Sequence, residues 1–191
     1  MRLFVAIPLP SDVAARASTL LPEALPGLRR VKAENLHVTL AFLGWTPDER
    51  LPDAAAAAAE AAAGVAPFAL AFEGAAGRFP ERGRPRVVWL GIGAGLESVR
   101  RLGERVAGAL RDRAVRFDDR PLASHLTLAR VREDATLAEA RTVAAALEAL
   151  AVPRLETEVR EIALFESVLS PRGPRYTARA HAPLLPQREG R

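Results

Sequence analysis

The sequence LHVTLAFL at residues 36–43 returns 88 residues later as SHLTLARV at residues 124–131, so the pattern HxTLA occurs twice. The chain has 191 residues but only three histidines and eight threonines. The chance that two of the three histidines carry a threonine two places later is therefore about half a percent, before the shared leucine and alanine are counted. The repeat indicates an internal duplication or a paired site.

Both copies alternate in polarity and predict β-strands. Side chains at i and i+2 of a strand lie on one face, roughly 7 Å apart. His37 and Thr39 should therefore share one face, and His125 and Thr127 should share the matching face of the second strand. The opposite, core-facing side should carry the alternate residues Val38, Leu40 and Phe42, and in the second copy Leu126, Leu128 and Arg130. Arg130 interrupts that apolar face, so it either snorkels to the surface or turns toward the polar pair.

The rest of the chain mixes single helices with more numerous strands. Helices are predicted at 12–21 with Ser11 as N-cap, at 53–63, at 96–112, and from the capping-box pair Thr136 and Glu139 to about Leu150. Further strands are predicted at 2–8, 67–73, 86–92, 114–118, 156–166 and 175–182. The segment GIGAGLES at 91–98 lacks the third glycine of a dinucleotide loop and reads as a strand-to-helix turn. This order predicts an α+β fold with antiparallel sheets.

The composition is that of an ordinary globular protein, with 49% hydrophobic and 26% charged residues. The absence of cysteine excludes disulfides and thiolate zinc sites. The apolar run at the N-terminus is broken by Pro8 and is too short for a signal peptide, and no stretch is long enough for a membrane span, so we expect a cytoplasmic protein. Lys32 is the only lysine, and the net charge of +4, carried by arginine, permits a nucleic-acid partner without requiring one. We expect residues 187–191 to be a disordered tail.

Two histidine–threonine pairs can act together on a phosphate. Histidine titrates near neutral pH, so one imidazole can serve as a base while the other serves as an acid. Threonine hydroxyls and arginines can hold the phosphate oxygens, and no metal or cofactor is then needed. Zinc binding is the rival use of histidine, but the sequence offers no convincing His/Asp/Glu cluster. The third histidine, His181, has no threonine two places later and is interpreted as a structural or surface residue.

The paired motifs resemble those of the two-histidine (2H) phosphoesterases, also described by the pattern HXTX. Within that superfamily the chain is most similar to the RNA 2′,3′-cyclic phosphodiesterases, also called 2′-5′ RNA ligases. The resemblance covers about residues 1–185, and its most specific parts are the two motifs with their FLG and LAR extensions. The other matching segments are RLFVAIPLP at 2–10, RFP at 78–80, RVVWLGI at 86–92 and LFESVLSPRGPRY at 164–176.

The resemblance implies one bilobal domain over residues 1–186, with two lobes of antiparallel sheet and helices related by a pseudo-two-fold axis around a central cleft. It implies that His37 is the proton donor and His125 the proton acceptor, and that Thr39, Thr127 and Arg130 bind phosphate.

The activity implied is metal-independent hydrolysis of a terminal RNA 2′,3′-cyclic phosphodiester to a 2′-phosphate. The reverse reaction would join RNA ends by a 2′-5′ linkage. Two alternatives remain: the same chemistry on another cyclic phosphate or a 2′-5′ oligonucleotide, and a non-catalytic module that binds RNA ends. We expect the protein to act as a monomer, without a cofactor, on RNA ends.

Overall fold

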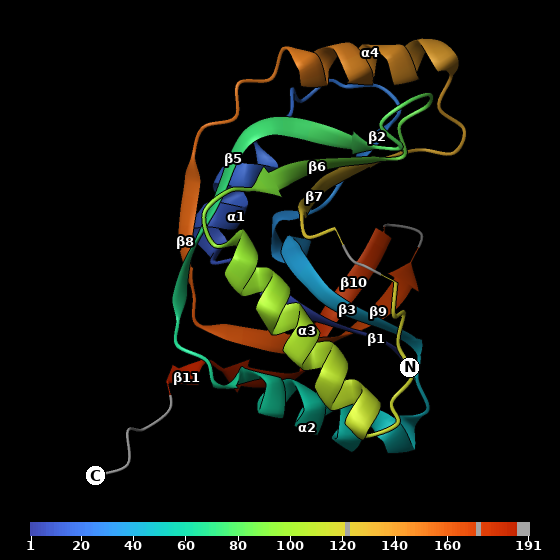
Figure 1. Ribbon diagram of the computed structural model, residues 1–191. Helices are drawn as coiled ribbons and strands as arrows, with labels where there is room; N and C mark the ends of the chain where they lie inside the picture. The colour runs from blue at the N-terminus through green and yellow to red at the C-terminus, as the bar shows by residue number, and fades with distance from the viewer. Residues whose placement is uncertain (121–122, 171–172, 187–191) are drawn as a thin grey trace.

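A computed structural model describes residues 1–120, 123–170 and 173–186 (Figure 1). Its centre is a curled nine-stranded sheet in the order β10-β9-β1-β3-β7-β6-β5-β8, with β2 also paired to β7. Every pairing in this sheet is antiparallel. The strands are β1 (Arg2–Pro8), β2 (Leu28–Arg30), β3 (His37–Trp45), β5 (Phe68–Phe79), β6 (Val87–Ile92), β7 (Leu126–Val131), β8 (Leu155–Val159), β9 (Glu161–Ser170) and β10 (Gly173–Pro183). A short parallel pair joins β4 (Ala63–Gly64) to β11 (Leu185–Pro186).

The sheet consists of two lobes that meet at the motif strands. The first lobe holds β10, β9, β1 and β3, and the second lobe holds β7, β6, β5, β8 and β2. Within the described residues, Val38 and Leu126 are the one pair that joins β3 to β7. Both residues are the middle position of an HxT motif, so an approximate two-fold axis passes through this pair. The predicted α+β fold with two related lobes is confirmed.

Each lobe is covered by a helix that belongs, in chain order, to the other lobe. Helix α1 (Ser11–Ser18) follows β1 but contacts β8, and α3 (Leu96–Asp112) follows β6 but contacts β3. Helix α2 (Leu51–Ala62) contacts α3, β9 and β10, whereas α4 (Leu137–Glu148) contacts β5 at the opposite end of the molecule (Figure 1). One hydrophobic core therefore runs through both lobes. No helix in the described part of the chain is both long and apolar enough to cross a membrane.

Each motif strand carries a β-bulge directly after its threonine. In β3, Ala6 of β1 pairs with Thr39 and Val5 pairs with Ala41, so Leu40 is the extra residue. In β7, the partners of Trp89 and Val88 are Thr127 and Ala129, so the extra residue is Leu128. An extra residue shifts every later side chain to the other face of the sheet.

Because of the bulges, Phe42 and Arg130 lie on the opposite face of the sheet from the one that strict alternation predicts. Unbroken alternation places both on the core side, but Phe42 is 43% exposed and Arg130 is also exposed. They lie on the same face as the threonines of their own strands. The two residues occupy equivalent positions in HVTLAF and HLTLAR. The repeated backbone therefore presents an aromatic ring in the first lobe and a cation in the second.

Some of the predicted elements differ from the structure for local reasons. The N-cap of α1 is Pro10 instead of Ser11, and the helix ends at Ser18, where the hydroxyls of Ser18 and Thr19 donate to carbonyls of the last turn. The predicted strand at 114–118 does not form, because Ala114 adopts a φ of 51° and turns the chain back after α3.

The segment 156–166 is two strands instead of one. It divides at Arg160 into β8 of the second lobe and β9 of the first lobe, so the chain crosses between the lobes at this residue. Strand β2 was not predicted. The capping box of Thr136 and Glu139 is confirmed, with both of its hydrogen bonds formed at 2.6 and 3.2 Å. The expected disordered tail, residues 187–191, lies outside the described residues.

Candidate active site

The two motifs lie side by side where the lobes meet. His37 is the first residue of β3, and His125 directly precedes β7. Because Val38 pairs with Leu126 in antiparallel orientation, His37 lies next to Thr127 across the strands, and Thr39 lies next to His125. The structure therefore brings together the four motif residues that the sequence singled out.

Both imidazoles are held in the same way by the backbone. The Nδ1 atom of His37 lies 2.7 Å from the carbonyl oxygen of Asn35, and that of His125 lies 2.6 Å from the carbonyl oxygen of Ala123. A carbonyl only accepts hydrogen bonds, so each Nδ1 carries the proton and each neutral ring leaves Nε2 as its basic atom. The Nε2 atom of His125 lies 3.1 Å from the hydroxyl oxygen of Thr127, which can donate to it.

The surroundings of both histidines favour the neutral ring. Burial lowers the pKa of His37, and although the Asn35 carbonyl raises it, the charges of Arg130 and His125 lower it further. Burial also lowers the pKa of His125, where the Ala123 carbonyl opposes the effect and Arg130 adds to it. Both groups are therefore mainly neutral at pH 7 in the free protein. A bound anion would offset the charge of Arg130 and raise both pKa values.

Arg130 contributes a positive charge to the cleft face of β7. The bulge at Leu128 places it on the same face as Thr127, and its charge adds to the effect of burial in lowering the pKa of His37 and His125. Its guanidinium makes no ion pair or side-chain hydrogen bond with any residue that the structure describes. The arrangement leaves its five N–H donors available for an anion.

Aromatic rings that the sequence analysis did not single out surround both imidazoles. The ring centroid of His37 lies 4.9 Å from that of Phe4 and 5.3 Å from that of Tyr176, which meets it edge-on. The ring of His125 lies 5.4 Å from Phe79 and 6.0 Å from Trp89. These residues come from four different strands, and each lies in one of the segments that carry the family resemblance, but those segments do not show that the rings meet. Only the pairing of the strands shows that they meet.

The position of the Trp89 side chain depends on a glycine on the neighbouring strand. Gly77 of β5 pairs with Trp89 of β6, which in turn pairs with Thr127. A Cβ atom on Gly77 would overlap the indole ring of Trp89. Gly77 therefore allows the indole to lie flat over β5 and beside His125. The indole Nε1 is buried without a hydrogen-bond partner among the described residues.

Asn35 is a second residue that the sequence analysis missed. The residue is 7% exposed, and its Nδ2 donates to the carbonyl oxygen of Pro174 on β10 at 2.9 Å. The same residue supplies the carbonyl that holds His37. The equivalent residue in the second lobe is Ala123, which has no polar side chain to anchor it. The first histidine therefore has a firmer support than the second.

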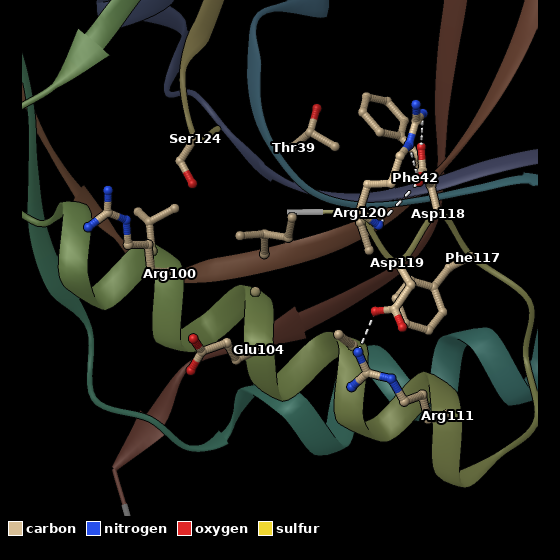
Figure 2. A pocket seen from close by; sticks show the side chains of 15 residues that line it. Thr39, Phe42, Arg100, Glu104, Arg111, Phe117, Asp118, Asp119, Arg120 and Ser124 are labelled. Atoms are coloured by element: carbon tan, nitrogen blue, oxygen red, sulfur yellow. Dashed lines mark hydrogen bonds and ion pairs between the residues drawn. The ribbon is translucent and has the colours of Figure 1, made fainter. Parts of the chain in front are cut away.

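Two hollows border the motif residues. The larger, about 570 Å³, runs between α3 and the 117–120 segment, and Thr39 and Ser124 line its upper edge in Figure 2. Ion pairs between Arg111 and Asp119 and between Arg120 and Asp118 line its far end. The smaller hollow, about 460 Å³, is lined in part by His37.

His181 also borders the smaller hollow, but its Nδ1 faces Glu161 at 3.3 Å. It is exposed, and its hydrogen-bond partner is Glu161 instead of a motif residue. Within residues 1–120, 123–170 and 173–186, no three His, Asp or Glu side chains come together in a group that could hold a metal ion.

Comparison with known proteins supports a common ancestry over nearly the full chain. The family model of the 2′-5′ RNA ligase superfamily matches residues 9–169. A protein of Thermus thermophilus named RNA 2′,3′-cyclic phosphodiesterase is 39% identical over 185 residues, which cover 93% of this chain and 87% of that protein. A protein of the same name from Archaeoglobus fulgidus is 34% identical over 178 residues, which cover 92% and 96% of the two chains.

Solved structures agree with the sequence relatives. The crystal structure of TT0787 of Thermus thermophilus matches with a TM-score of 0.79 and 34% identity, covering 98% of this chain and 100% of that chain. Escherichia coli LigT complexed with 3′-AMP matches with a TM-score of 0.71 and 26% identity, covering 96% and 97%. The paired motifs lie at the lobe boundary, the family model matches, and the relatives align along nearly their whole length. The chain therefore belongs to the 2′-5′ RNA ligase superfamily.

Proposed function

We propose that this protein hydrolyses the terminal 2′,3′-cyclic phosphodiester of RNA and leaves a 2′-phosphate. The observation that carries the proposal is the pair of imidazoles at the lobe boundary, each with Nδ1 bound to the carbonyl two residues before it. This pairing leaves two Nε2 atoms as the proton-transferring groups of one site. The names of the relatives support the same substrate class.

In the proposed reaction, Nε2 of His125 takes a proton from water while the water oxygen bonds to phosphorus. Protonated His37 gives its Nε2 proton to the 3′-oxygen as the phosphorus–oxygen bond to that atom breaks. The phosphate stays on the 2′-oxygen, His125 ends protonated and His37 ends neutral. Thr39, Thr127 and Arg130 hold the two non-bridging oxygens and stabilise the charge that they gain.

The phosphodiester anion favours the protonated form of His37 that the proposed step requires. In the free protein, burial and the charge of Arg130 lower the pKa of His37. A bound anion adjacent to the ring acts in the opposite direction and favours the imidazolium. Substrate binding therefore raises the pKa of the donor at the moment when its proton is needed.

The test is turnover of an RNA oligonucleotide with a 2′,3′-cyclic phosphate end, with and without EDTA, followed by identification of the product phosphate. We expect full activity with chelator and a 2′-phosphate product. His37→Ala and His125→Ala should each lose most of the rate, because neither proton transfer can replace the other. His181→Ala is the matched control, since this exposed histidine faces Glu161, and it should keep its activity.

Activity near that of the wild type in either motif variant, or its loss on chelation, would contradict the two-histidine mechanism. A panel of substrates extends the same assay to other cyclic phosphates and to 2′-5′ oligonucleotides. Incubating RNA with a 5′-hydroxyl end and the cyclic phosphate together measures ligation in the reverse direction.

A further inference from the structure

A second arginine lies directly opposite Arg130. In the antiparallel pair of β2 and β7, Arg29 faces Arg130, with Leu28 opposite Val131 and Arg30 opposite Ala129. Opposed residues of an antiparallel pair point to the same face, with Cβ atoms about 4.5–5.5 Å apart. Arg29 therefore shares the cleft face with Arg130, and both are exposed.

The pair concentrates positive charge that no described side chain neutralises. Like charges directly opposite each other destabilise a sheet. Neither Arg29 nor Arg130 forms an ion pair or a side-chain hydrogen bond with any residue in the described ranges. Arg30, by contrast, is held by the carbonyl oxygens of Leu21 and Pro22. An arrangement that costs stability in the free protein becomes favourable when an anion binds between the two guanidinium groups.

The acidic groups close to Arg29 are already engaged. Asp134, whose pKa Arg29 helps to lower, is bound by Arg132 through two hydrogen bonds, one of them 2.9 Å long. The carboxylate of Glu139 accepts the capping-box bond from the backbone of Thr136. Among the described residues neither carboxylate forms an ion pair with Arg29, so its guanidinium stays available for an anion.

The position of Arg29 relative to the motif residues suggests what it binds. In the described part of the chain, strand β3 pairs with β7 only at Leu126, and β2 takes over the same edge of β7 from Ala129 to Val131. The two positive charges are therefore at different distances from the motifs along the sheet. Arg130 on β7 is close enough to lower the pKa of both imidazoles, and Arg29 lies beside it on β2. A terminal phosphate bound at the histidines would contact Arg130. The next phosphate along the RNA strand would then contact Arg29.

We propose that Arg29 binds the phosphodiester immediately before the terminal cyclic phosphate of RNA. This inference rests on the proposed function and adds a substrate class to it: an oligonucleotide with at least one internal phosphate, preferred over a cyclic mononucleotide. Arginine suits this role because its planar fork matches two phosphate oxygens.

The experiment compares two substrates, a nucleoside 2′,3′-cyclic monophosphate and a short oligonucleotide with the same cyclic end. Arg29→Ala should lower kcat/KM for the oligonucleotide by about ten- to a hundredfold, the loss of one charge-assisted bond, and leave the mononucleotide unchanged. It should also reduce the dependence of oligonucleotide binding on salt. Arg29→Lys should recover part of the loss, and Arg141→Ala, at an exposed arginine of α4, is the matched control.

A third substrate isolates the contact itself. An oligonucleotide with an uncharged methylphosphonate at the last internal linkage should react with the wild type as poorly as the normal oligonucleotide reacts with Arg29→Ala. Combining the variant with this substrate should cost nothing more, because both changes remove the same interaction.

The outcomes separate the inference from the proposed function. If the wild type hydrolyses both substrates and Arg29→Ala slows neither, or slows both equally, the inference fails and the proposed function stands. Additive losses from the variant and the methylphosphonate would also overturn the inference. If the wild type hydrolyses neither substrate, the proposed function fails and the inference fails with it.

Discussion

Replacing Asn35 with alanine should disturb His37 without touching the imidazole. The Nδ2 of Asn35, a residue that is 7% exposed, donates to the Pro174 carbonyl oxygen at 2.9 Å. Its loss removes the donor to a half-buried carbonyl, which costs about 1 kcal/mol of the free energy of unfolding. The Asn35 carbonyl, 2.7 Å from Nδ1 of His37, then loses its anchor to β10. Misplacement of a catalytic group by about 1 Å can cost on the order of a hundredfold in rate.

The pH profile distinguishes this positioning role from general destabilisation. The carbonyl of Asn35 raises the pKa of His37, so a weaker bond lowers that pKa further. In the proposed mechanism His37 must be protonated to donate, and its pKa therefore sets the alkaline limb of kcat/KM. The alkaline limb should move to lower pH in Asn35→Ala. In Asn35→Asp it should move to higher pH, because a carboxylate near the ring favours the imidazolium.

The two variants form a matched pair, since a carboxylate cannot donate to Pro174 and both lose the same hydrogen bond. Both should unfold at a lower temperature than the wild type, Asn35→Asp the more so because it also places a carboxylate in a buried site, and they should show opposite shifts in pH profile. The assay is turnover of the cyclic-phosphate substrate from about pH 5 to about pH 9, which spans the range in which histidine titrates. A wild-type alkaline limb in both variants, despite lowered stability, would refute the reasoning.

Three further predictions follow from the site. Gly77→Ala should cost about 1–3 kcal/mol of stability, because the new methyl group overlaps the ring of Trp89, and it should also lower kcat/KM. Gly91→Ala, whose Cβ would make only ordinary van der Waals contacts, is the control for thermal unfolding. Thr39→Ala and Thr127→Ala should each lower kcat by roughly one to two decades, the scale of one phosphate hydrogen bond, with unchanged unfolding midpoints. The profile of kcat/KM for the wild type should be bell-shaped, and its acidic limb should lie below pH 6.5 because burial lowers the pKa of His125, the group that must be neutral. An acidic limb above that value would contradict the assignment of His125 as the base.

Local patterns predicted much of the fold. The limits of α3 and the capping box at Thr136 follow from helix periodicity and cap chemistry, which act over a few residues. The motif strands were predicted for the same reason, with His37 and Thr39 on one face. These features depend on neighbouring residues, and the sequence displays those neighbours directly.

The remaining features depend on partners far along the chain. The alternation rule assumes an unbroken ladder, so it misplaced Phe42 and Arg130, which the bulges at Leu40 and Leu128 move to the cleft face. The support of His37 by Asn35 requires Pro174, which lies 139 residues away. Similarly, the crossing of α1 and α3 between the lobes is set by the packing of whole layers. A single sequence carries no local signal for any of these contacts.

The order of strands in the first lobe has a consequence for synthesis on the ribosome. Strand β1 lies between β3 and β9, so Leu3 pairs with Glu166, and β9 itself pairs with β10. The first lobe therefore stays open at β1 until almost all of the described chain has been translated. A nascent chain that stops before Gly173 would expose one edge of β9 and lack both Pro174 and Tyr176. The cleft between the two motif strands is thus among the last parts of the molecule to form, although its first histidine is made early in synthesis.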